Sequence, residues 1–298
     1  IYFWFPLVFL ISQRTNTIKF KFCYVKLSFF ISDSGIPNII FVQKLMSPTL
    51  SFPLLAVPFF IMTGVIMNFA GISKRIMNLA DTMVGHFVGG FAQINILMST
   101  MMGGMSASAN ADAAMQSKIV VPEMIKRNYT PGFSAAITAC SAIIAVVIPP
   151  GIGLVLYGFI SGTSIGKLFL AGIVPGIFLS VVLMLTVRFL SYKKNFLPSR
   201  EKKATGKELF AAFKESIFGL LIPILIVGGI RFGAFTPTEA GAIAVAYSLF
   251  VGFFIYKELT LSLIPIIINQ TVIATSVILL IICAASSFGY YLTWERVP

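Results

Sequence analysis

The stretch Gly103–Ala114, GGMSASANADAA, lies in the middle of an apolar run that extends from about residue 87 to residue 122. A helix needs about 20 apolar residues to cross a bilayer, so this run is too long for one ordinary span. The stretch itself consists of small and polar residues, which make poor lipid-facing helix. Lys126 and Arg127 follow the second apolar half. We therefore predict a re-entrant helical hairpin over 87–122, with both of its ends facing the cytoplasm.

A second interruption lies in the run 133–161, which is long enough to cross a membrane completely. Pro149, Pro150 and Gly151 stand in its middle, and each proline removes one helical hydrogen bond. In lipid, the freed carbonyl groups must be satisfied by neighbouring protein or by a water-filled cavity. The sequence therefore predicts a broken transmembrane helix.

The composition of the whole chain indicates which class of protein contains these two interruptions. Of the 298 residues, 57% are hydrophobic and only 11% are charged, and the mean hydropathy is +0.94. Soluble domains carry roughly 25% charged residues, so a soluble globular protein is excluded. The sequence has no series of ten-residue alternating strands, which leaves helices as the spanning structure. We expect an all-α polytopic membrane protein.

The net charge of +12 would suggest nucleic-acid binding in a soluble protein. Here the basic residues lie between the apolar runs, as the positive-inside rule predicts for cytoplasmic loops. We therefore expect the lipid bilayer as the surrounding medium and no nucleic acid as a partner. The resulting topology places four lysines in the cytoplasm: Lys74, Lys126, Lys202 and Lys257.

The order of apolar and basic segments predicts the organisation of the chain. Residues 1–38 receive no assignment. A first transport repeat, 39–191, holds a helix, the hairpin, the broken helix and a return helix over 166–191. A basic cytoplasmic loop with a short interfacial helix, Gly206–Ser216, occupies 192–215, and further membrane helices occupy 216–298. At the start of one of these helices we expect Thr236 as N-cap, with Pro237 and Glu239 in the first turn.

The hairpin tip, residues 103–112, carries the side chains best suited to binding. Ser106 and Ser108 offer hydroxyl groups, Asn110 offers an amide, and Gly104 permits close approach. Such hard oxygen ligands, at the ends of half-helices, are what a transporter uses to hold sodium, and free N–H groups there can face an anionic substrate. Small-residue packing between helices is the alternative. The nearby helix break favours a site, because paired interrupted helices mark transport sites.

Asp112 has two readings. An acid inside a membrane segment is a functional hypothesis by default. A carboxylate in the first turn of the second half-helix also stabilises the positive helix end. The complete predicted sodium and substrate site is Gly104, Ser106, Ser108, Asn110, Asp112, Pro149, Pro150 and Gly151, with Ser106, Ser108, Asn110 and Gly151 as sodium ligands. We expect sodium as coupling ion and no cofactor.

Enzyme signatures are missing from the sequence, which has no P-loop, no HExxH and no GxSxG motif. We therefore expect neither an enzyme nor an ATP-driven step.

Ordered motifs run through most of the chain: SFPLLAVPFFIMTGVIMN at Ser51–Asn68, VGHFVGGFAQINI at Val84–Ile96, GGMSASANADAA at Gly103–Ala114, IPPGIGLVLYG at Ile148–Gly158, SIGKLFLAGIVPG at Ser164–Gly176 and FTPTEAGAIAVAY at Phe235–Tyr247, before the closing LTWERVP. In these motifs the chain resembles the large membrane subunit of tripartite ATP-independent periplasmic (TRAP) transporters. The family usually has Gly-Ser where this chain has Ala107-Ser108, and Ser where it has Gly151. At the second position a hydroxyl group is lost while the backbone carbonyls remain.

The resemblance implies a sodium-driven importer of organic acids in the bacterial inner membrane. Its partners would be a small membrane subunit and a periplasmic solute-binding protein. It also implies an elevator-type fold built from two inverted repeats, of which these residues would form the first. We therefore expect a fragment or a truncated gene that does not transport on its own.

Two other interpretations stay open. One is a dicarboxylate or ion antiporter that uses the same hairpin and broken helix without a binding protein. The other is a truncated membrane remnant that does not transport, in which the small residues serve packing only. The sequence does not identify the organic acid.

Overall fold

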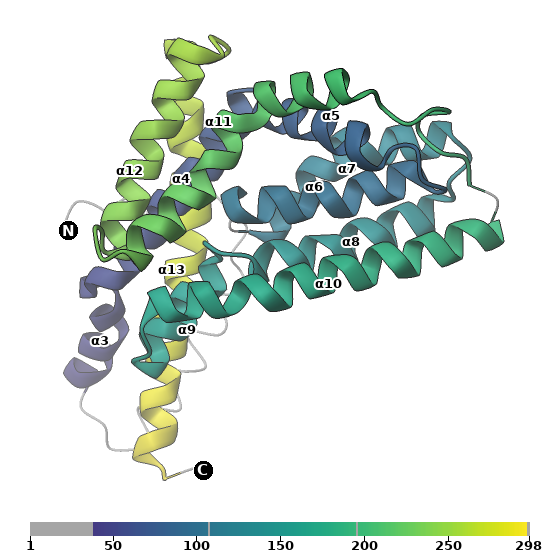
Figure 1. Cartoon of the computed structure of the whole chain (residues 1–298). Helices are drawn as coiled ribbons and strands as arrows, with labels where there is room; N and C mark the ends of the chain where they lie inside the picture. The colour runs from purple at the N-terminus through teal and green to yellow at the C-terminus, as the bar shows by residue number, and fades with distance from the viewer. Residues whose placement is uncertain (1–37, 107, 195, 297–298) are drawn as a thin grey trace.

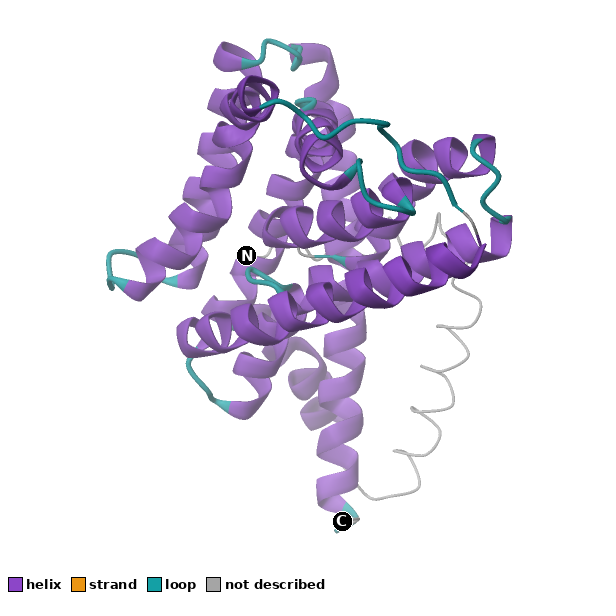
Figure 2. Ribbon diagram, turned by 45° about the vertical axis from the view of Figure 1, so that its right-hand side comes forward, coloured by secondary structure: helices purple, strands orange, loops and turns teal. Residues whose placement is uncertain are grey.

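The structure is a computed structural model that describes residues 38–106, 108–194 and 196–296. The regular secondary structure of this part is helical throughout (Figure 2). Five of its helices are long and apolar enough to cross a membrane, and one bent helix pair would make a sixth. The prediction of an all-α polytopic membrane protein is confirmed. The unassigned segment 1–38 lies, apart from its last residue, outside the described residues.

The helices follow one another with short connections. In order they are α3 (Asn38–Met46), η1 (Ser47–Leu50), η2 (Phe52–Leu55), α4 (Ala56–Phe69), α5 (Ile72–Val84), α6 (Gly90–Ser106), α7 (Ala109–Lys126), α8 (Pro131–Val147), α9 (Ile152–Ser161), α10 (Ile165–Lys194), α11 (Gly206–Arg231), α12 (Pro237–Phe250), the π-helical turn η3 (Val251–Ile255), η4 (Leu261–Leu263) and α13 (Ile264–Trp294).

The long helices form two groups (Figure 1). The hairpin group consists of α6, α7, α8 and α10, which lie side by side. The support group consists of α3, α4, α12 and α13, which run in a different direction. Helices α5 and α11 pack against each other and carry the chain between the groups, α5 from α4 to α6 and α11 from α10 to α12. The hairpin is thus held by two connecting helices.

Close packing of α4 on α12 forms the centre of the support group. A Cβ atom added at Gly241 would lie 2.9 Å from the Cβ atom of Phe59, so only glycine permits this approach. The start of α12 is as predicted, with a capping box in which Thr236 and Glu239 satisfy each other's backbone N–H groups and Pro237 is the first helical residue.

Two connecting helices differ from the prediction. We expected a separate interfacial helix over Gly206–Ser216, but α11 continues without a break to Arg231. The residues at the expected boundary, KES, are compatible with a helix, and α5 packs against α11. Helix α5 was not predicted, because it is amphipathic and too polar to be recognised as a span.

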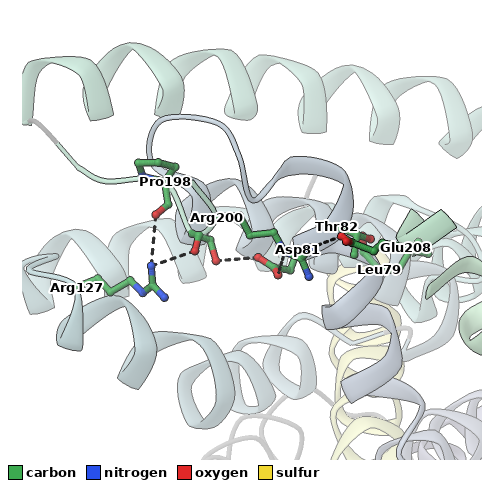
Figure 3. Close-up of polar contacts among 8 residues, drawn as sticks. Leu79, Asp81, Thr82, Arg127, Pro198, Arg200 and Glu208 are labelled. Atoms are coloured by element: carbon green, nitrogen blue, oxygen red, sulfur yellow. Dashed lines mark hydrogen bonds and ion pairs between the residues drawn. The ribbon is translucent and has the colours of Figure 1, made fainter. Parts of the chain in front are cut away.

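The basic loop after α10 is fixed to the connecting helices α5 and α11 by polar contacts (Figure 3). Arg200 Nε lies 2.6 Å from Asp81 Oδ2 on α5, and Arg200 Nη1 lies 3.2 Å from Glu208 Oε2 on α11. Ser199 Oγ donates a hydrogen bond to Asp81 Oδ1 at 2.7 Å. The hydrogen bond to Asp81 raises the pKa of Arg200 above its ordinary value, so this guanidinium is charged at every physiological pH.

Both ends of the hairpin meet this loop. Ahead of α6, the Gly89 N–H donates to the Phe196 carbonyl at 3.4 Å. After α7, Arg127 Nη1 donates to the Ser199 carbonyl at 3.1 Å (Figure 3). The chain therefore enters and leaves the hairpin at the same place.

Candidate functional site

The hairpin tip lies where α6 gives way to α7. Ser106 is the last residue of α6, and Ser108 is the N-cap of α7. The Ser108 Oγ atom accepts a long hydrogen bond, 3.4 Å, from the Ala111 N–H. Asn110 follows in the first turn, where it is exposed. The tip therefore presents polar groups at a helix N-terminus, which carries a partial positive charge.

The helix break lies between α8 and α9, which are bent by 47° relative to each other. Pro149, Pro150 and Gly151 form the connection and are buried. The last helical bond of α8 runs from the Ile148 N–H to the Ile144 carbonyl. The carbonyl groups at the end of α8 are consequently free of helical partners, and they are candidate ligands for a cation.

The structure brings the hairpin tip against the helix break. A Cβ atom added at Gly103 would lie 2.9 Å from the Ala145 Cα atom of α8. A Cβ atom added at Gly104 would lie 2.8 Å from Pro223 of α11 and 3.3 Å from the Pro149 carbonyl oxygen. The two glycines therefore allow the backbones of the tip, the break and α11 to approach closely.

Asp112 lies inside the hairpin and is buried, with 1% of its surface exposed. Its Oδ2 atom accepts hydrogen bonds from Ser99 Oγ of α6 at 2.6 Å and from Gln116 Nε2 of α7 at 2.8 Å. Ser99 and Gln116 also contact each other. Its Oδ1 atom has no hydrogen-bond partner in the described part of the chain. The side chain thus links the two arms of the hairpin.

Helix α6 makes further polar links that the sequence analysis did not single out. Buried Asn95 accepts a hydrogen bond from Ser141 and donates one to Thr138, both on α8. Thr100 bonds Ser180 on α10 at 2.7 Å. Polar residues inside the apolar run 91–102 were the available signal, since such residues often bond neighbouring membrane helices. These links join the hairpin, the broken helix and the return helix into one unit.

The predicted site residues divide into two places. Gly104, Ser108 and Asn110 are at or beside the tip, and Pro149–Gly151 form the break against which the tip packs. Asp112 lies deeper, between the arms. The arrangement offers hydroxyl, amide and carbonyl oxygens in two interrupted segments, a set that suits a hard monovalent cation. In the described ranges, no three His, Cys, Asp or Glu side chains come together as a metal site.

Comparison with known protein families matches residues 3–298 to the family described as the tripartite ATP-independent periplasmic transporter, DctM component.

Individual relatives agree with this match. The chain is 39% identical, over 94% of its length, to the sialic acid TRAP transporter large permease protein of Vibrio cholerae, of which it covers 65%. It is 40% identical, over 87% of its length, to the 2,3-diketo-L-gulonate TRAP transporter large permease protein of Escherichia coli, covering 60% of that protein. It is 35% identical, over 86% of its length, to the C4-dicarboxylate TRAP transporter large permease protein of Pseudomonas aeruginosa, covering 59%. The chain therefore spans less than two thirds of the length of these relatives.

Proposed function

Because the chain belongs to the DctM family of tripartite ATP-independent periplasmic transporters, a family of non-enzymatic permease subunits, we propose that it serves sodium-coupled import of organic acids. The three relatives are named for sialic acid, a diketogulonate and C4-dicarboxylates. These compounds share a carboxylate group, which supports an organic acid as the substrate class of this chain.

The proposed setting is the bacterial inner membrane, in an assembly with a small membrane subunit and a periplasmic solute-binding protein. The family description, with its periplasmic and tripartite terms, supports both partners. The binding protein would capture the acid and deliver it to the membrane subunits.

The close approach of the hairpin tip to the helix break is the observation that carries the proposed mechanism. Sodium would be held by oxygens of Ser106, Ser108 and Asn110 together with backbone carbonyls at Pro149–Gly151. The bound cation would in turn attract the substrate carboxylate, which the N-terminal turn of α7 also favours. Binding of sodium and of the acid is thereby coupled through one location.

The direct test is uptake of labelled organic acid by the complete transporter in proteoliposomes. We expect uptake that requires an inward sodium gradient and the binding protein. Sodium-dependent uptake without the binding protein would instead indicate the antiporter-like alternative. Uptake that is indifferent to sodium would refute the proposed coupling.

The proposed site makes a sharper prediction for Asn110. Asn110→Ala removes one neutral oxygen ligand and should raise the sodium concentration for half-maximal uptake by about twofold to twelvefold, because a lost ligand of this kind is worth about 0.5–1.5 kcal/mol. Ser117→Ala is the matched control, since Ser117 is also exposed on α7 but bonds only the Ala114 carbonyl. Equal sodium dependence in both variants would mean that the tip serves packing alone.

A further inference from the structure

A cavity of about 650 Å³ opens between the hairpin group and the support group. One wall is the corner between α9 and α10, with Gly158, Phe159, residues 162–167 and Leu170. The other wall is the corner between α11 and α12, with Ile230, Arg231 and Pro237, and Pro53 of η2. The volume lies within the roughly 300–1,000 Å³ that ligand sites occupy. It is separate from the hairpin tip, whose residues do not line it.

Two cationic side chains line this cavity from opposite walls, Lys167 from α10 and Arg231 from α11. Neither takes part in any ion pair among residues 38–106, 108–194 and 196–296. The acid next to the Pro237 wall, Glu239, uses its Oε2 atom to accept hydrogen bonds from Thr236. Two like charges without a protein counter-ion in one cavity favour an anionic ligand.

The cavity lies at the end of the molecule opposite to the basic loop. Lys167 is at the start of the 30-residue helix α10, whose last turn carries Lys193 and Lys194. At 1.5 Å per residue, such a helix reaches about 45 Å, which is the thickness of a bilayer with its headgroups. Arg231 likewise ends α11, which begins at the basic loop. Both cations are thus placed at headgroup level on the far side of the membrane.

An apolar ridge on α10 leads away from the cavity. Its residues stand at positions i, i+4, i+7, i+8 and i+11 and so share one face of the helix, and they are exposed by 37–73%: Leu170, Val174, Ile177, Phe178 and Val181. Leu170 also lines the cavity. A charged pocket that continues into an exposed apolar ridge matches a molecule with an anionic head and hydrocarbon chains.

We propose that this cavity binds the phosphate headgroup of an anionic membrane phospholipid, between Lys167 and Arg231, with the acyl chains along the α10 ridge. Lys and Arg near the membrane surface attract anionic lipid headgroups. Lys167 is on α10 of the hairpin group, and Arg231 ends the connecting helix α11, just before α12 of the support group. One bound headgroup would therefore connect the hairpin group to the corner between α11 and α12.

Native mass spectrometry of the purified protein in maltoside micelles tests the proposal, with phosphatidylglycerol or phosphatidylcholine added at equal mole fraction. We expect one phosphatidylglycerol retained at collision energies that remove phosphatidylcholine. Lys167→Gln combined with Arg231→Gln should lower the retained fraction at least about tenfold. The control, Lys202→Gln with Lys203→Gln, removes the same charge from exposed positions in the basic loop and should retain the lipid.

Circular dichroism verifies that both double variants keep the helical content of the parent protein. Equal loss of phosphatidylglycerol from the two double variants would overturn the proposal, since binding would then follow net charge. Complete displacement of the lipid by millimolar inorganic phosphate would also overturn it, because the cavity would then be a site for a free oxyanion.

Discussion

Asp112 shows how a single side chain can be read in two ways until its partners are known. The structure turns it toward Ser99 and Gln116, between the arms of the hairpin, so its geometry is that of a cross-link. The sequence placed it in the first turn of the second half-helix, as observed, and the structure shows Ser108 as the N-cap of this helix. Its partner on α6 is thirteen residues away, and only tertiary packing brings the two together.

Asp112→Ala should therefore weaken the hairpin. The change leaves the buried Ser99 hydroxyl donor without its acceptor, while Gln116 keeps its contact with Ser99, and the expected cost is about 1–3 kcal/mol. We expect a lower midpoint of thermal unfolding in detergent, followed by circular dichroism. Ser117→Ala, on the same helix but exposed, should leave the midpoint unchanged. A wild-type midpoint for Asp112→Ala, with altered sodium dependence of uptake, would instead identify Asp112 as an ion ligand.

At the scale of elements, the contact between hairpin tip and helix break depends on the absence of side chains. Gly103→Ala would place a methyl group 2.9 Å from the Ala145 Cα atom and force α6 away from α8, at about 1–3 kcal/mol. Gly132→Ala is the matched control in α8, since nothing lies within 4 Å of its added Cβ. We expect reduced thermal stability and uptake for the first variant only. Equal behaviour of the two would show that the tip does not pack closely on α8.

The helix break and the hairpin tip were predictable because short stretches of sequence determine them. The Pro149–Gly151 break removes helical hydrogen bonds wherever it stands in a helix, and the polar stretch at the tip cannot continue a lipid-facing span. The continuity of α11 was not predictable, because its polar first half and apolar second half look like two segments. Helix α5 was missed because it is stabilised by packing against α11 rather than by a bilayer.

At the scale of the whole molecule, the basic loop between α10 and α11 lies at the base of the hairpin. Its side chains bond residues of both α5 and α11. Asp81→Asn removes the ion pair with Arg200, in which both side chains are partly exposed, at about 1 kcal/mol or less. We expect faster trypsin cleavage after Arg200, by up to about fivefold, measured by mass spectrometry of the released peptides. Glu123→Gln removes the exposed pair with Lys126 and is the control. An unchanged cleavage rate would mean that backbone contacts alone hold the loop.

The membrane topology states which side of the bilayer each connection between these elements faces. Arg75 pairs with Glu258 at 2.6 Å, so the start of α5 and the connection before α13 lie at one end of the molecule. The end of the hairpin and the basic loop also lie side by side, since Arg127 Nη1 donates a hydrogen bond to the Ser199 carbonyl. Positive-inside bias assigns both places to the cytoplasm. If the segment 87–122 instead crossed the membrane once, as a single span, Lys126 would lie on the side opposite to Lys74.

Single cysteines in a variant free of Cys23, Cys140 and Cys283 decide between these topologies. Lys74→Cys and Lys126→Cys should both react with a membrane-impermeant maleimide only in inverted vesicles, in which the cytoplasmic face is exposed. Thr163→Cys, at the corner between α9 and α10, should react only in intact spheroplasts. The chain would then change sides between Lys126 and Thr163, by crossing the membrane in the broken helix. It would not change sides in the hairpin. Labelling of Lys74→Cys and Lys126→Cys from opposite sides would refute the re-entrant hairpin and, with it, the placement of its tip inside the membrane.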